Sequence, residues 1–223
     1  MAHALIDTGN LGEYDEQDLF ENIANNLNVK GYSTHPNALS PSLSASLWEH
    51  LQYISPGKFK RAGVGRVNKH TLNDFIRTDE ISWINGETQA GNAWLIWTNA
   101  LKTYLNQRLF LGLFSFESHF AHYGKGDFYK KHQDAFKGEA NRVVSIVVYL
   151  NPDWTPDDGG ELLIYTGECD SSTVTVTPGF GTIVLFLSEE FPHEVLKTKR
   201  DRYSIAGWFR LNSSKTDRVD PPM

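Results

Sequence analysis

The feature that most constrains the fold is a succession of short apolar or alternating runs from Leu111 to Phe209. Turn-forming clusters separate these runs, among them residues 151–153, 158–160 and 178–181. Runs of this length, bounded by Gly, Pro, Asn and Asp, are typical of strands. Seven or eight such strands predict a β-sandwich or jelly roll. We expect the strands at residues 113–123, 142–150, 161–165, 173–176, 182–187, 194–197 and 202–209.

The first half of the chain has the periodicity of helices. Apolar residues recur every three or four positions, which indicates amphipathic helices over residues 14–28 and 90–107. A further helix starts at Pro41, with Ser40 as its N-cap. The expected buried positions are Leu19, Ile23 and Leu27; Leu43, Leu47 and Leu51; and Trp94, Trp97, Leu101 and Leu105.

The predicted fold class is therefore mainly β with flanking helices. A jelly-roll core, or double-stranded β-helix, occupies residues 111–212 and packs against a helical support region at residues 1–110 of the same domain. Residues 213–223 form a C-terminal tail. Segment 55–79 is rich in Gly, Lys and Arg, and we expect a long exposed loop or irregular hairpin there, either a mobile lid or a plain surface excursion.

Charge and composition exclude some classes of function. The 27 acidic residues outnumber the 21 basic ones, which argues against nucleic-acid binding. The lone cysteine, Cys169, allows no intrachain disulfide and favours a reducing compartment. The N-terminal residues lack the basic and apolar regions of a secretory signal, and no run approaches the roughly 20 apolar residues of a membrane span. We expect a cytoplasmic protein without membrane or nucleic-acid partners.

The first candidate for chemistry is His132-Gln133-Asp134. On a strand or at its end, positions i and i+2 project to the same side, so one imidazole and one carboxylate can hold one ion. The tripeptide alone is equally typical of a solvated polar loop. His193, 59 positions after Asp134, completes a set of two histidines and one carboxylate. Such a set suits Fe(II) and leaves three positions open for a bidentate co-substrate and dioxygen, although a lone histidine beside a strand is often structural.

The second candidate is Arg202, nine positions after His193. It shares one strand face with Ser204, Ala206 and Trp208, as Tyr149 does with Ser145 and Val147. An inward guanidinium can hold a carboxylate through two hydrogen bonds, or it can pair with a structural acid. The order and spacing of all these residues favour an iron site next to an anion pocket.

On these residues the chain resembles the prolyl hydroxylase branch of the 2-oxoglutarate oxygenases, especially the hypoxia-inducible-factor prolyl hydroxylases and their bacterial relatives. The resemblance covers Phe75 to Phe209. It is carried by residues 76–84, Tyr123, residues 129–134, 149–154, 159–162, 192–195 and 202–205.

The resemblance implies roles for individual residues. His132, Asp134 and His193 match the iron ligands, and Arg202 matches the residue that binds the distal carboxylate of 2-oxoglutarate. Tyr149 matches a tyrosine that supports the same carboxylate. Tyr123 matches one near the keto-acid end, although the loop after it is one residue shorter here. The positions that match the lining of the substrate pocket are Tyr129, Arg142 and Trp208. Core packing is the alternative for Tyr149 and Trp208.

The resemblance also implies an activity. A prolyl 4-hydroxylase-like enzyme would use Fe(II), 2-oxoglutarate and dioxygen, with ascorbate as a further candidate, and would couple hydroxylation to the release of succinate. The expected partner is a protein carrying the target proline, such as a translation factor or a ribosomal protein, and segment 55–79 would fold over the bound peptide. Two alternatives stay open: an oxygenase that acts on a small molecule or another residue, and a non-catalytic jelly-roll sensor or binding module.

Overall fold

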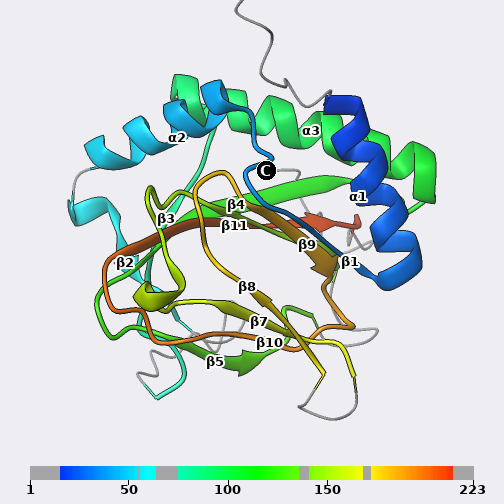
Figure 1. Ribbon diagram of the computed structural model, residues 1–223. Coiled ribbons are helices and arrows are strands. Elements are labelled where there is room, and N and C mark those ends of the chain that lie inside the picture. Colours follow the sequence, from blue (N-terminus) through cyan, green and yellow to red (C-terminus); the bar gives the residue numbers. More distant parts are fainter. Residues whose placement is uncertain (1–15, 55, 64–74, 136–140, 168–171, 213–223) are drawn as a thin grey trace, which may run out of the picture.

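The computed structural model of the 223-residue chain describes residues 16–54, 56–63, 75–135, 141–167 and 172–212. Helices, a seven-stranded sheet and a four-stranded sheet form three layers (Figure 1). All strand pairs are antiparallel. The large sheet has the order β1 (Tyr32–His35), β9 (Ile183–Leu187), β6 (Arg142–Tyr149), β11 (Arg202–Arg210), β4 (Ser115–Tyr123), β3 (Glu80–Trp83) and β2 (Lys60–Arg61). The small sheet has the order β5 (Tyr129–His132), β10 (His193–Val195), β7 (Leu162–Tyr165) and β8 (Thr173–Val176).

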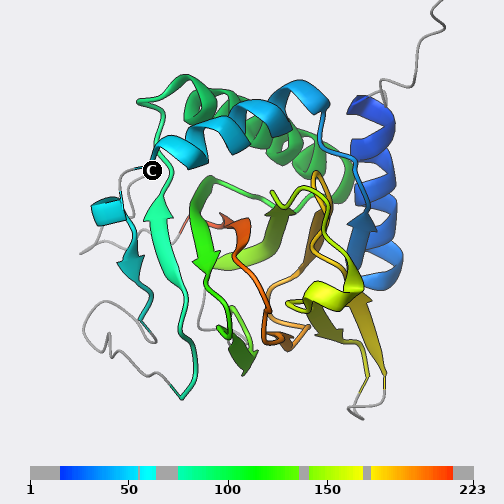
Figure 2. The same cartoon turned by 60° about the vertical axis from the view of Figure 1, so that its left-hand side comes forward.

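Three helices cover one face of the large sheet. Helices α2 (Pro41–Tyr53) and α3 (Gln89–Leu109) lie over the sheet, and α1 (Glu16–Lys30) runs beside the edge strand β1 (Figure 2). Every helical position predicted to be buried is buried. The helices share one core with residues of the sheet such as Phe116, Phe120 and Ile146, so the helical layer packs directly on the large sheet.

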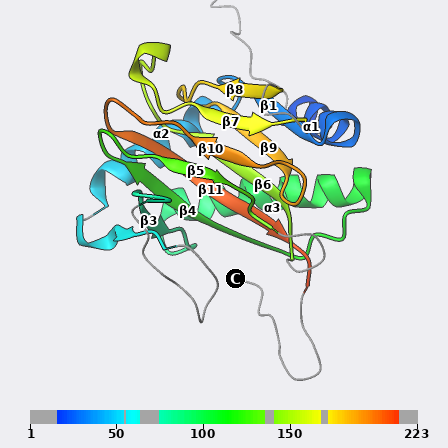
Figure 3. The same ribbon diagram turned by 90° about the horizontal axis from the view of Figure 1, so that it is seen from below.

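The small sheet lies across the other face of the large sheet (Figure 3). A second apolar cluster fills the space between the sheets, with Tyr149 and Phe186 from one side and Leu162, Ile164 and Val195 from the other. Two facing antiparallel sheets with this cluster between them confirm the predicted jelly-roll fold class. The predicted strands agree with the observed ones to within a few residues.

Two features differ from the expectation. Strands β1, β3 and β5 were not among the expected strands, because each is four residues long and gains its stability from pairing with β9, β4 and β10. The described part of segment 55–79, expected as a long exposed loop or irregular hairpin, contains the short helix η1 (Pro56–Lys58) and β2, which pairs with β3, and Ala62 and Asp79 are buried.

Some expectations lie outside the described residues. These are the N-terminal residues 1–15, residues 64–74 of the expected lid, Cys169 and the C-terminal tail 213–223. In the described part of the chain, no helix has the length and apolar character needed to cross a membrane.

Candidate metal centre and anion pocket

Three side chains from the small sheet and the loop after β5 converge on one point. His132 ends β5, His193 begins β10, and the two are direct partners in the antiparallel register. Asp134 follows β5, with Oδ1 3.8 Å from Nε2 of His132 and Oδ2 3.7 Å from Nε2 of His193. One potential ligand atom from each of the three residues lies within 4.8 Å of the other two, and this is the only such trio among the described residues.

Backbone carbonyls determine which nitrogen of each histidine is free. Nδ1 of His132 is 2.8 Å from the carbonyl of Lys130, and Nδ1 of His193 is 3.0 Å from the carbonyl of Phe191. Each Nδ1–H therefore donates to a carbonyl, and the lone pair of each Nε2 points into the cluster. Burial, and then the nearby His193, lower the pKa of His132 to about 3, so its imidazole is neutral.

Asp134 supplies the negative charge of the cluster. Burial alone would raise its pKa, but the neighbouring His193 and His132 and a hydrogen bond from Ser145 outweigh burial and lower it. Oγ of Ser145 donates to Oδ2 of Asp134 at 2.6 Å and also contacts Oγ of Ser188 at 2.9 Å. Two imidazoles and one carboxylate on one side of a point are the donor set that Fe(II) takes in oxygenases. The residues present therefore fit this metal.

A cationic pocket lies further along the inner face of the large sheet. Arg202, the first residue of β11, is only 1% exposed. Its Nε donates to the carbonyl of Gly160 at 2.8 Å, and no carboxylate pairs with it in the described part of the chain. Rings of Tyr123 and Tyr149 lie 4.9 and 5.0 Å from its guanidinium carbon. A buried charge without a counter-ion is costly, so the pocket is suited to an anion that arrives from outside.

Tyr149 reinforces this interpretation. Its hydroxyl is buried and has no hydrogen-bond partner among the described residues. Burial raises the pKa of Tyr149 to about 12, so the hydroxyl keeps its proton and can donate. A guanidinium and a free O–H in one buried pocket match the two oxygens of a carboxylate.

Two further residues, one at the metal cluster and one at the anion pocket, were missed by sequence reasoning. Oγ of Ser145 donates a hydrogen bond to Asp134, and the carbonyl of Gly160 accepts one from Arg202. Gly160 has φ +69°, and a Cβ there would lie 2.9 Å from Cδ of Arg202, so the turn requires glycine. The signal for Gly160 was present in the Gly159-Gly160-Glu161 stretch, whereas nothing in the sequence distinguishes Ser145 from any other strand serine.

The remaining predicted site residues surround the metal cluster. The ring of Tyr129 stacks on that of His132, with centroids 3.5 Å apart. The guanidinium of Arg142 lies 3.7 Å from the ring centroid of Trp208, whose buried Nε1 has no partner among the described residues. Arg142 also pairs with Glu117 at 2.8 Å. The structure thus brings all nine predicted site residues to the inner face of the jelly roll.

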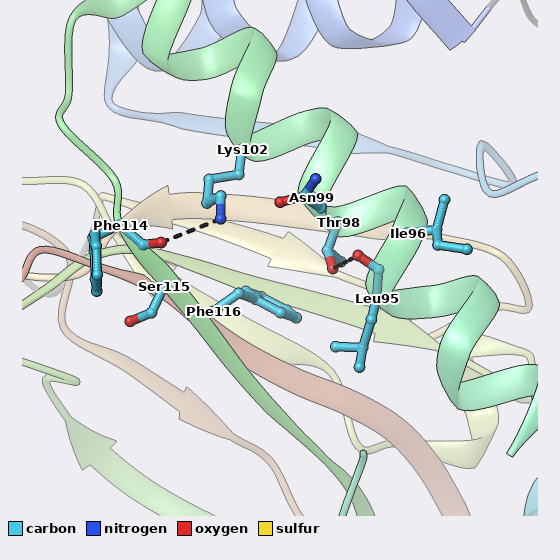
Figure 4. Close-up of a pocket in the computed structure, with 8 residues that line it drawn as sticks. All are labelled: Leu95, Ile96, Thr98, Asn99, Lys102, Phe114, Ser115 and Phe116. Carbon is cyan, nitrogen blue, oxygen red and sulfur yellow. Dashed lines mark hydrogen bonds between the residues drawn. The ribbon is translucent and has the colours of Figure 1, made fainter. Parts of the chain in front are cut away.

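Two surface pockets lie elsewhere. One, of about 390 Å³, lies between α3 and the start of β4, where Lys102 donates to the carbonyl of Phe114 (Figure 4). The other, of about 510 Å³, is lined by Lys131, Tyr165 and Glu190, among others. Neither contains a member of the metal cluster, so the chemistry is not assigned to either of them.

A jelly roll that holds two histidines and a carboxylate beside a buried arginine defines the class of non-haem iron oxygenases. The sequence profile of the 2OG-Fe(II) oxygenase superfamily matches residues 118–210. The solved relative described next is 36% identical and covered to 99% of its own length, so the chain belongs to this family. It is thus a 2-oxoglutarate-dependent dioxygenase, prolyl 4-hydroxylase-like, that uses Fe(II), 2-oxoglutarate and dioxygen.

Individual relatives place it near the prolyl hydroxylases and confirm the resemblance seen in the sequence. A Pseudomonas putida prolyl-4-hydroxylase is 36% identical with a TM-score of 0.77, and the match covers 86% of this chain and 99% of that one. A Trichoplax adhaerens prolyl hydroxylase, solved with a hypoxia-inducible-factor peptide, is 28% identical with a TM-score of 0.77, covering 87% and 90%. Mouse prolyl hydroxylase EGLN3 is 30% identical over 156 residues, 67% of this chain and 62% of the mouse protein.

Proposed function

We propose that the enzyme hydroxylates a prolyl residue in a protein and couples this to the decarboxylation of 2-oxoglutarate to succinate. The observation that carries the proposal is the buried Arg202–Tyr149 pocket beside the His132, Asp134 and His193 cluster. The proposal is supported by the match of this chain to nearly the whole of a bacterial prolyl-4-hydroxylase.

Each predicted site residue has a role in this proposal. His132, Asp134 and His193 hold the iron, which, when bound, supplies the activation of dioxygen. Arg202 and Tyr149 bind the distal carboxylate of 2-oxoglutarate, and Tyr123 packs beneath the guanidinium close to the co-substrate. Tyr129, Arg142 and Trp208 line the entrance and contact the substrate. By enclosing the reaction, these side chains exclude water from it.

The partner in this proposal is a protein with an accessible proline, with a translation factor or a ribosomal protein as candidates and the cytoplasm as the expected compartment. Ascorbate is a further candidate as an accessory reductant. We also propose that residues 1–110 and 111–212 form one domain, which the core shared by helices and sheet supports.

The test starts with the metal. Anaerobic calorimetry with Fe(II) should show one site in the wild type and none in His132→Ala or Asp134→Ala. The matched control is His122→Ala. His122 lies on β4 and pairs with Asp201, away from the cluster. Iron binding by Asp134→Ala equal to that of the wild type contradicts the ligand assignment.

The second part of the test concerns the substrate. Release of carbon dioxide from 2-oxoglutarate should be stimulated by proline-containing peptides, with a gain of 16 Da on proline. Stimulation only by small molecules would support the metabolite alternative, and an absence of any turnover would support the sensor module. Arg202→Ala should mainly raise the KM for 2-oxoglutarate.

A further inference from the structure

The inner face of the large sheet continues beyond the metal cluster toward the edge of the molecule. Along β11, Arg202 lies at the buried end and Trp208 lies six positions further on, toward the other end. Next to Trp208, His119 projects from β4, and Trp83 is the direct cross-strand partner of His119 on β3. The ring of His119 lies 5.2 Å from that of Trp83 and 5.5 Å from that of Trp208. These three residues form what we call the aromatic row.

The aromatic row is half-buried at Trp208, buried at His119 and exposed at Trp83, its outer end. His119 is 4% exposed and Trp83 is 53% exposed, one of the large apolar side chains that the described surface leaves open to water. A half-exposed indole at the outer end of a row that begins at a reactive centre indicates a contact surface rather than a core. Burial lowers the pKa of His119 to about 4, so the middle ring carries no charge at neutral pH.

The charged side chains beside the row are engaged in ion pairs. Glu117 pairs with Arg142 at 2.8 Å and with Arg210 at 3.3 Å, and Arg142 stacks on Trp208. The row therefore offers flat, uncharged rings next to an ion-paired group in which two guanidiniums share one carboxylate. Grooves lined with aromatic rings recognise extended peptides by packing against proline and other apolar side chains.

We propose that the aromatic row binds the part of the substrate polypeptide that flanks the target proline, and that Trp83 selects an apolar side chain there. The row starts at Trp208, beside the metal cluster, and its three rings cover roughly 10 Å, or about three residues of extended chain at ~3.3 Å per residue. The selected side chain thus lies about three to five residues from the target proline. This inference rests on the proposed function, because it needs a protein substrate.

The experiment uses the full chain with Fe(II) and 2-oxoglutarate on a degenerate peptide library. Each peptide has a central proline and five randomised positions on each side, and mass spectrometry sequences the peptides that gain 16 Da. The wild type should enrich apolar residues at one position, on one side of the proline. Trp83→Ala should lose that enrichment while other preferences persist, and its KM for the best peptide should rise about tenfold. The KM for 2-oxoglutarate and the unstimulated release of carbon dioxide should not change.

Two variants serve as controls. Trp83→Phe keeps a ring and should retain the enrichment in weakened form. Ile96→Ala removes an apolar side chain of similar exposure, 63%, from the α3 pocket in Figure 4, and should select peptides as the wild type does.

Several outcomes overturn the inference. Unchanged selection by Trp83→Ala shows that the row does not contact substrate, while protein hydroxylation stands. A change in oligomeric state in that variant, measured by sedimentation, with unchanged selection assigns Trp83 to contacts between copies of the chain. A wild type that modifies no peptide removes protein hydroxylation, and the row's role with it.

Discussion

Ser145 and Tyr149 lie on the same face of β6, and the protein uses their hydroxyls in opposite ways. Ser145 donates to a carboxylate within the molecule, whereas the hydroxyl of Tyr149 is buried with no partner in the described chain. A satisfied hydroxyl contributes to structure, and an unsatisfied one costs stability unless a ligand completes it. Changes of single atoms at these two residues therefore separate metal binding from co-substrate binding.

Removal of the Ser145 hydroxyl should weaken the metal site without unfolding the sheet. In Ser145→Ala, Asp134 loses the hydrogen bond that orients Oδ2, and the affinity for Fe(II) should fall about tenfold or more. Anaerobic calorimetry measures the change. The matched control is Ser118→Ala, a serine buried on the opposite face that accepts from Nε1 of Trp94; this variant should lose stability but keep its metal affinity.

Tyr149→Phe should have effects of opposite sign on stability and on co-substrate binding. Without 2-oxoglutarate, loss of an unsatisfied buried hydroxyl should stabilise the protein by about 1 kcal/mol. With 2-oxoglutarate, the lost hydrogen bond to a carboxylate should raise KM about tenfold. Thermal unfolding and co-substrate titration check the pair of effects. If Tyr149 were only a packing residue, the KM for 2-oxoglutarate would not change. The control is Tyr203→Phe, which removes a hydroxyl from the other face of the sheet.

At the scale of elements, residues 76–79 tie the two sheets together. They pair with the edge of the small sheet through Lys130 N–H to the carbonyl of Ile76 and Thr78 N–H to the carbonyl of Phe128, and β3 of the large sheet follows directly. Arg77 and the buried Asp79 form a two-pronged ion pair, and Arg77 also lies 4.3 Å from the centre of the Tyr129 ring. The pair thus contacts the residue that stacks on His132.

Asp79→Asn should destabilise the protein more than removal of both charges. The single change leaves the guanidinium of Arg77 buried without a counter-ion, at a cost of about 3–5 kcal/mol. The double replacement of Arg77 by Met and Asp79 by Leu removes the buried charge and should cost less. Urea denaturation of the three proteins decides this, and equal losses for the single and double variants would contradict a role for the ion pair.

The sequence allowed the central elements to be predicted because their signals are local. The helical stripes around Leu47 and Trp94 and the alternation in β11 are visible in the order of residues alone. The metal trio could be predicted because His132 and Asp134 are close in sequence and His193, just past a predicted strand, completes a set of two histidines and one carboxylate. By contrast, β1 and β3 depend on partners more than 35 residues away, and the aromatic row joins Trp83 to His119 only through strand pairing. No local pattern carries such information.

At the scale of the whole molecule, buried histidines link folding to pH. His119 and His132 are each buried with a lowered pKa, about 4 and about 3, against an ordinary value of 6.5. The unfolded chain takes up protons at these residues as the pH falls below 6.5, whereas the native state does not until the lowered pKa is reached. Acid therefore favours unfolding over this interval, and stability is greatest above it.

His119→Gln tests this linkage away from the metal ligands. The free energy of unfolding of the metal-free wild type should fall as the pH drops from about 6.5 to about 4, and the variant should lose part of that slope, at most about 1.4 kcal/mol per pH unit for one proton. Urea titrations at several pH values measure it. Parallel curves for the two proteins would show that His119 is not the group that titrates.

The geometry of β6 limits which co-substrate the site accepts. Ser145 donates to Asp134, and Tyr149 faces Arg202. These two residues are four positions apart on β6, which is about 13 Å along an extended strand that cannot lengthen. The strand therefore fixes the distance between Arg202 and the metal cluster, and this distance selects the length of the carbon chain of a diacid. Oxaloacetate, one methylene shorter than 2-oxoglutarate, and 2-oxoadipate, one methylene longer, should both support little turnover, because neither reaches from end to end without strain.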